Sequence, residues 1–523
     1  MNRRLRLPDR RGWASSTAIL CSLLAACAVG PDYQRPPLPA SQGYGQANGG
    51  EPSAPTSGAP LVGARVGLQR FSPGADVMAT WWRSFESPAL NELVERAFIA
   101  NPNLQAAQAA LRAAQENVAA QKGYFFPTVQ VSYSPARSKI AGNQGGSSPG
   151  IQGDGTVIST RAGTPASAGG AAPFNSPVIY NFHTAQVTVG FNPDVFGVNR
   201  RLVESLAANA RLQGLQLEAS YITLATNVVA AAIQDALLRR QLATAQALIE
   251  SSVSALEIVQ RQQRLGYATR LDVANQETAL AQARQLLPPL QKQFGQNQNL
   301  LRTLTGSPQD AELPAAFDLE QLKLPPELPL RLPSQLVEQR PDIRAAEEQV
   351  RALSELVGVA RANRLPQFSI EANAGGGARQ INQMFSPGGP FFNLAGNLAA
   401  PVFDAGTLKF RERAARENLQ QAAAQYQATV LTAFQNVADT LQAIQADAQA
   451  LETALAVEQA AQAALRLTRK QHASGYIDRL VLLNAERVLQ QAQFDVAQAK
   501  ANRLGDTATL YQALGGGWWN RAT

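Results

Sequence analysis

Cysteine and histidine are almost missing from this sequence. Its 523 residues include two cysteines, Cys21 and Cys27, and two histidines, His183 and His472. Beyond position 27 the chain therefore lacks the residues for a disulfide framework, a thiolate nucleophile or a Cys/His zinc site. It also has no nucleophile motif, no His-x-x-x-His pair and no phosphate-binding loop. We expect no cofactor, no metal and no catalytic site, and the sequence does not predict an enzyme.

Charge is scarce as well, because only 16% of the residues are charged. The formal net charge is +7, but residues 1–26 hold five arginines and one aspartate. The remainder carries 41 basic against 38 acidic residues, which removes the support for a nucleic-acid partner. The many alanines and glutamines suit long, weakly ionic helices instead.

The N-terminus has the pattern of an export signal. A basic stretch that includes Arg10 and Arg11 precedes a short apolar run, Trp13 to Ala26, which is too short to span a membrane in the mature protein. The run ends in Leu24-Ala25-Ala26-Cys27, which resembles a bacterial lipobox. We expect residues 1–26 to be a lipoprotein signal peptide and Cys27 to be lipidated, although a simple signal peptide with a chance cysteine is the alternative. Residues 27–76, rich in Gly, Pro and Ser, predict a lipid-anchored flexible segment.

Ordered structure is expected from residue 77 onward. Ser87-Pro88 and Asn101-Pro102 are helix-start signals. Alternating apolar residues predict strands at 129–133 and 185–191, separated by a long Gly/Ser/Pro-rich loop at 134–177. Residues from about 198 to 263 contain no proline and predict one helix roughly 100 Å long. The chain should reverse at Gly266 and return over 271–304, with a kink at Pro288-Pro289.

The same order then returns after a Pro-rich connector at 306–333. Residues 368–374 and 392–398 predict two more strands, and a long helix from about 407 to 473 is followed by a turn at Gly475 and a return to about 513. A constant shift of 209 carries Gly266 onto Gly475 and Gly306 onto Gly515. We interpret this as an internal duplication, with repeats at 77–305 and 334–515 and a tail at 516–523.

Four strands with one apolar face suggest a transmembrane barrel, but four strands cannot close one. Open edges in lipid would leave backbone N–H and C=O groups unpaired at several kcal/mol each, so the chain must oligomerise. Two copies would supply 8 strands and three would supply 12. The residues alone do not decide between them.

The chain resembles the TolC-like outer-membrane efflux proteins, specifically their lipoprotein branch of the OprM/NodT type. The resemblance rests on the duplicated order and on the motifs Trp81-Trp82, Asp194-Val195-Phe196-Gly197, Pro401-Val402-Phe403-Asp404 and the two Gly-Tyr turns. It implies a mainly α fold with a β-barrel part: a homotrimer with a 12-stranded barrel in the outer membrane and a 12-helix tube of antiparallel coiled coils in the periplasm. It also implies an exit duct for small molecules, working with a periplasmic adaptor and an inner-membrane pump of the resistance-nodulation-division type.

The resemblance places the candidate functional residues at the two helix turns. Asp272 and, in the second half, Asn484 are the candidates for a gate at the periplasmic aperture, although Asp272 could equally be a helix cap. Candidates for adaptor contact lie beside them, although the glycines among them also serve a tight turn. These candidates are Leu265, Gly266, Thr269, Arg270, Gly475 and Tyr476.

Two other functions remain open at this point. A duct of the same fold could export peptides or proteins in a type I secretion system. A lipid-anchored structural coiled coil could span the periplasm, but such a protein would not need the alternating segments.

Overall fold

The computed structural model describes residues 33–37, 69–140, 150–151, 157–158, 178–313, 317–331 and 333–521. Cys27 and the expected signal peptide lie outside these residues. The chain forms two compact units. The first contains 115–208 and 351–421 together with the chain up to Gln34, and the second contains 35–114, 209–350 and 422–523.

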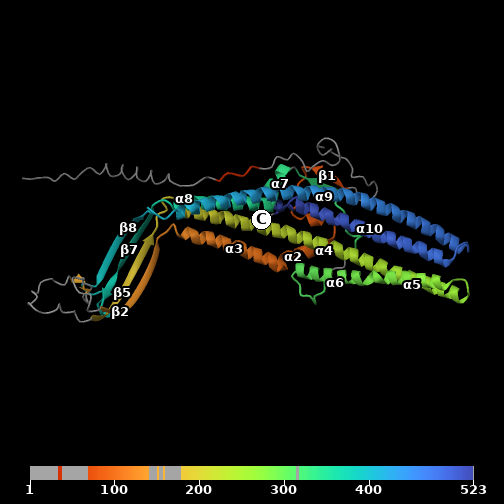
Figure 1. Cartoon of the computed structure of the whole chain (residues 1–523), viewed down its shortest axis with the longest axis horizontal. Coiled ribbons are helices and arrows are strands. Elements are labelled where there is room, and N and C mark those ends of the chain that lie inside the picture. Colours follow the sequence, from red (N-terminus) through yellow and green to blue (C-terminus); the bar gives the residue numbers. More distant parts are fainter. Residues whose placement is uncertain are drawn as a thin grey trace, which may run out of the picture. The chain divides into compact units, whose positions relative to one another are not determined.

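The first unit holds a four-stranded antiparallel sheet in the order β2-β5-β7-β8 (Figure 1). Its strands are β2 (Thr128–Ile140), β5 (Val178–Phe191), β7 (Gln367–Ala378) and β8 (Pro390–Ala399). All four predicted strands are present, and each extends beyond its alternating segment because the backbone ladder continues past the residues that alternate. Two short strands, β3 (Gly150–Ile151) and β4 (Val157–Ile158), pair inside the segment predicted to be a loop.

Two shorter helix pairs open the two halves of the chain. They are α2 (Pro88–Ala100) with α3 (Pro102–Gly123), and α7 (Pro333–Gln339) with α8 (Pro341–Ala362). Ser87 caps α2 as predicted, because its Oγ accepts a hydrogen bond from the Leu90 N–H at 3.3 Å.

The long helices are α4 (Val198–Arg264) and α9 (Thr407–Ala473), each followed by a returning segment. The first return is broken at Leu286 into α5 (Arg270–Gln285) and α6 (Leu287–Leu304), since Pro288 and Pro289 cannot donate backbone hydrogen bonds. The second return, α10 (Arg479–Ala513), has no proline and is continuous. The predicted kink is thus a full break. Among the described helices only α4 is long and apolar enough to pass as a membrane span, but 72% of its apolar window is buried.

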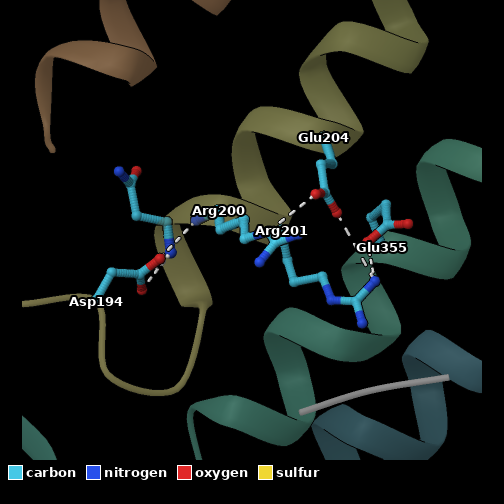
Figure 2. A network of polar contacts seen from close by, with 6 residues as sticks. Asp194, Arg200, Arg201, Glu204 and Glu355 are labelled. Atoms are coloured by element: carbon cyan, nitrogen blue, oxygen red, sulfur yellow. Dashed lines mark hydrogen bonds and ion pairs between the residues drawn. The ribbon is translucent and has the colours of Figure 1, made fainter. Parts of the chain in front are cut away.

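An aspartate caps the N-terminus of each long helix. Asp194 accepts hydrogen bonds from the backbone N–H groups of Asn199 and Arg200 at 2.9 and 2.7 Å (Figure 2). Asp404 does the same for Gly406 and Leu408 at 2.9 and 2.8 Å, and these bonds lower its pKa from the ordinary value. The two motifs with Asp, Val and Phe are therefore strand-to-helix junctions whose carboxylates satisfy free helix donors.

A buried ion pair holds the start of α4 against α8. The Arg201 Nη1 lies 2.6 Å from the Glu355 Oε2, and both side chains are buried (Figure 2). Burial raises the pKa of Glu355, and the hydrogen bond and charge of Arg201 oppose that rise. Gly358 leaves room for this arginine, since a Cβ there would lie 3.3 Å from its side chain. Removing one partner would leave the other charge buried and uncompensated, which is strongly destabilising.

Equivalent side chains tie each short helix pair to the end of a returning helix. Asn101 donates from Nδ2 to the Leu304 carbonyl at 2.9 Å, and Arg340 donates from Nη1 to the Ala513 carbonyl at 2.9 Å. Leu304 and Ala513 are the last residues of α6 and α10. The residue before the proline that opens α3 or α8 thus donates to the last carbonyl of α6 or α10, which has no hydrogen-bond donor within its own helix.

The second unit also orders residues that the sequence does not mark as structured. β1 (Arg70–Pro73), at the end of the segment expected to be flexible, pairs in parallel with β6 (Glu327–Leu330) from the connector. Asp76, three residues after β1, contacts both the C-terminal residues and the residue after β6. It accepts hydrogen bonds from Trp519 Nε1 at 3.1 Å and Asn520 Nδ2 at 2.7 Å, and it forms an ion pair with Arg331. These contacts join residues more than 250 positions apart, which no local pattern can predict.

A half-buried carboxyl pair connects α9 to α10 in the same unit. Burial raises the pKa of Asp447 to about 6, and a hydrogen bond with Asp506 and its charge act in the same direction. Arg503 opposes the rise and donates from Nε to Gln69 Oε1 at 3.1 Å.

Candidate functional site

The two turns between the long helices and their returns have the same backbone. In the first turn (residues 265–269) Gly266 N–H donates to the Gln263 carbonyl at 3.1 Å and Tyr267 N–H to the Gln262 carbonyl at 2.8 Å. In the second turn (residues 474–478) the N–H groups of Gly475 and Tyr476 donate three and five residues back in the same way, both at 3.0 Å. This is the Schellman motif, and its glycine must adopt a positive φ.

The glycines meet that demand with φ of 81° at Gly266 and 75° at Gly475. No atom would lie within 4 Å of a Cβ added at either position. The requirement for glycine is therefore a backbone requirement and does not come from crowding.

The first turn is closed by a capping box on α5. Thr269 is the N-cap, and its Oγ1 accepts from the Asp272 N–H at 3.2 Å. The Asp272 carboxylate in turn accepts from the Thr269 hydroxyl and N–H, both at 2.7 Å. These two bonds lower the pKa of Asp272 from its ordinary value. The interpretation of Asp272 as the helix cap needs a correction: Thr269 is the cap, and Asp272 stands three residues into the box.

The second turn uses a different cap. Asp478 is the N-cap of α10 and accepts from the Val481 N–H at 3.0 Å. His472 closes the turn from the other side, since its Nδ1 lies 3.1 Å from the Ile477 carbonyl oxygen. Arg469 of α9 and Glu486 of α10 form an ion pair at 3.2 Å nearby. The second turn is therefore tied to both of its helices by side chains.

Large side chains project into solvent at both turns. The exposed fractions are 65% for Leu265, 84% for Tyr267, 68% for Leu271 and 85% for Tyr476. Tyr267 and Leu271 were missed as candidates, although the 209-residue shift that relates the turns carries Tyr267 onto Tyr476. That shift was the signal that could have found it.

A cavity of about 470 Å³ lies between the helices close to the turns, and it is bounded by α4, α5 and α10. Val481 and Asn484 line it, whereas Asp272 does not. The Asn484 Oδ1 accepts hydrogen bonds from Arg487 at 3.0 and 3.3 Å. The structure therefore brings Asn484 to this cavity and leaves the other gate candidate, Asp272, in the capping box of α5. The remaining lining residues are Ser251, Ser252, Ala255, Gln276, Ala279, Leu480, Leu483 and Arg487.

Nothing in this arrangement resembles a reaction centre. In the part of the chain that the structure describes, no three His, Cys, Asp or Glu side chains gather closely enough to hold a metal ion. Asp272, Asp478 and His472 serve as caps and ties at the turns, and the large exposed apolar groups are Leu265, Tyr267, Leu271 and Tyr476.

The sequence pattern of the outer membrane efflux protein family matches residues 93–307 and 332–516. The chain belongs to this family. The pyoverdine export outer membrane protein OpmQ of Pseudomonas putida is 30% identical over 442 residues, which cover 84% of this chain and 88% of OpmQ. The toluene efflux pump outer membrane protein TtgC of Pseudomonas putida is 27% identical over 508 residues, covering 97% of this chain and 96% of TtgC.

Solved structures show the same fold. The outer-membrane channel OprN superposes with a TM-score of 0.73 at 25% identity and covers 94% of this chain and 100% of OprN. The chain is thus a TolC-like outer-membrane efflux protein, and its place is the bacterial outer membrane with extension into the periplasm.

Proposed function

We propose that this protein is the passive exit duct of a tripartite efflux system that exports small molecules. The observation that carries the proposal is the sheet of the first unit. Its strands have one apolar and one polar face, and β2 and β8 each leave an open edge. Such edges cannot face lipid, so copies of the chain must close them. Three copies would give a 12-stranded barrel around a polar lumen, with the long helices forming a 12-helix tube.

The rest of the chain is consistent with two structural repeats, at 77–305 and 334–515, around a connector at 306–333. The hydrogen bonds from Asn101 to Leu304 and from Arg340 to Ala513 support this, since donor and acceptor recur in the same places. Residues 1–26 would be removed as a signal peptide, and lipid on Cys27 would anchor the segment up to residue 76. Several acyl chains on one residue anchor stably, whereas a single chain does not.

The two turns are the proposed contact with a periplasmic adaptor, and through it with an inner-membrane resistance-nodulation-division pump. Leu265, Tyr267, Leu271 and Tyr476 supply exposed apolar and aromatic surface there. Aromatic residues at this level of exposure are typical anchors of protein interfaces. Gly266, Thr269, Arg270 and Gly475 shape and flank that surface. The names of OpmQ and TtgC, which mention pyoverdine and toluene, make small organic compounds the proposed cargo class.

The test is the oligomer mass and single-channel conductance of the purified protein in a planar bilayer, with wild type beside Asp272→Ala and Asn484→Ala. A trimer whose low conductance rises in a variant supports the duct and makes that residue a gate. A conducting trimer whose conductance is the same in both variants keeps the duct and leaves Asp272 as the N3 member of the capping box. A monomer or helical dimer without conductance would refute the duct and favour a structural coiled coil. A trimer that rescues export of a peptide but not of small organics would favour type I secretion.

A further inference from the structure

The register of the sheet separates its side chains into two faces. Val131, Val187, Ala374 and Phe392 stand opposite one another across β2, β5, β7 and β8, and they belong to the apolar face. Because side chains alternate along a strand, the residues one position away form the other face. That face is polar and contains Gln130, Ser132, Gln186, Thr188, Asn373 and Asn393.

The polar face carries one side chain that is charged at neutral pH. Among the described residues of the four-stranded sheet the formal charges are Arg137 and Lys139 on β2 and Glu371 on β7. Arg137 and Lys139 share the alternation of Val131, so they lie on the apolar face beyond its hydrophobic part. Glu371 alternates with Ile370 and Ala372 and lies on the polar face.

The surroundings of Glu371 leave its carboxylate uncovered. Its neighbours across the ladder are Gly190 on β5 and Ala395 on β8, which have no side chain or a single methyl group. The Asn373 Nδ2 donates to the Glu371 Oε1 at 3.0 Å and orients it. In the described part of the chain no lysine or arginine forms an ion pair with it. The carboxylate is therefore exposed, oriented and not neutralised.

We propose that Glu371 makes the barrel lumen selective for cations, and that cationic small molecules are the cargo class this lumen favours. The inference rests on the proposed trimer, in which the polar face points inward and three copies of Glu371 form a ring. Rings of carboxylates are how many pores prefer cations, because the low-dielectric wall concentrates their field in the lumen. The other polar-face groups are neutral amides and hydroxyls, so they discriminate little by charge.

The test is the reversal potential of the purified protein in a planar bilayer under a tenfold KCl gradient at low salt. The wild-type reversal potential should have the sign of a cation-selective channel. In Glu371→Gln the reversal potential should move toward zero, and in Glu371→Lys it should move toward the sign of an anion-selective channel. The control is Arg137→Gln, which changes charge by the same amount on the apolar face and should leave the reversal potential near the wild-type value. The shift should shrink near 1 M salt, where the Debye length falls from about 10 Å to about 3 Å.

Failure of this inference is distinguishable from failure of the duct. A conducting wild-type trimer whose reversal potential is unchanged in Glu371→Gln would overturn the role of Glu371 and leave the duct standing. An equal and opposite shift in Arg137→Gln would also overturn it, because net charge alone would then set selectivity. If Glu371→Gln does not assemble, Glu371→Ala decides in its place, since alanine matches its small neighbours. A wild type without conductance would refute the proposed duct itself.

Discussion

The two helix turns share a backbone but not a cap. Both end their long helix in a Schellman motif with a glycine at positive φ, and both place an exposed tyrosine directly after it. In the first turn the carboxylate is Asp272, inside the returning helix, whereas in the second it is Asp478, at the cap itself. The same backbone geometry is therefore required at both turns, whereas the position of the negative charge differs between them.

The difference has a consequence for the aperture. The position that corresponds to Asp272 in the second half is Val481, which lines the cavity between the helices. An acidic ring built from Asp272 would therefore have no acidic partner at Val481. If the turns gate the duct, their two halves must contribute unequally.

The largest expected effect is that of replacing the turn glycines. Gly266→Ala and Gly475→Ala should each destabilise their turn by about 1–2 kcal/mol, because alanine resists positive φ. Hydrogen exchange of the backbone amides at the N-terminal ends of α5 and α10 measures this local loss of stability. Gly295→Ala is the matched control, since Gly295 lies inside α6 without positive φ and alanine should stabilise that helix. Unequal losses at the two turns would show that their backbones are not equivalent.

A somewhat smaller effect is expected from the caps. Asp478→Ala should cost about 1 kcal/mol at the start of α10, because it removes the N-cap acceptor. Asp272→Ala should loosen the start of α5 less, since the bond from its own N–H to Thr269 Oγ1 survives. Hydrogen exchange at the starts of α5 and α10 measures both losses of stability. The loss in Thr269→Ala should equal the loss in Asp478→Ala. A larger loss in Asp272→Ala than in Thr269→Ala would contradict the assignment of Thr269 as the cap.

Acid should have effects of opposite sign in two places. The folded pKa of Asp272 is lowered, so its stabilisation is complete above the unfolded value of 3.8 and is lost as pH falls further. The folded pKa of Asp447 is raised to about 6, so its carboxylate destabilises the α9–α10 contact above that pH and ceases to do so below about 4.

Hydrogen exchange between pH 7 and 3, corrected for intrinsic rates, separates the two responses. Acid should loosen the start of α5 and tighten the region around Asp447. Asp272→Asn and Asp447→Asn are the isosteric controls, and each should abolish only its own response. A response at α5 that persists in Asp272→Asn would assign the titration to another group.

Most elements follow from local pattern. Alternation predicted the four strands, and Pro288-Pro289 predicted the interruption of the first return, because the relevant physics acts within a few residues. The strand ends and the role of Asp272 did not follow. The strand ends depend on where the partner strand stops pairing. The role of Asp272 depends on whether Thr269 or Asp272 takes the cap position, which the sequence leaves open.

The sequence by itself determined the two glycine turns, the long helices, the strands and the order in which they recur, since each is encoded by neighbours along the chain. Only the tertiary structure decided that Asp76, just after β1, accepts a hydrogen bond from Trp519, and that Glu371 is the single charge on the polar face of the sheet as far as its residues are described. Those facts depend on which distant segments pair and in which register, and a shift of one residue would have moved Glu371 to the other face.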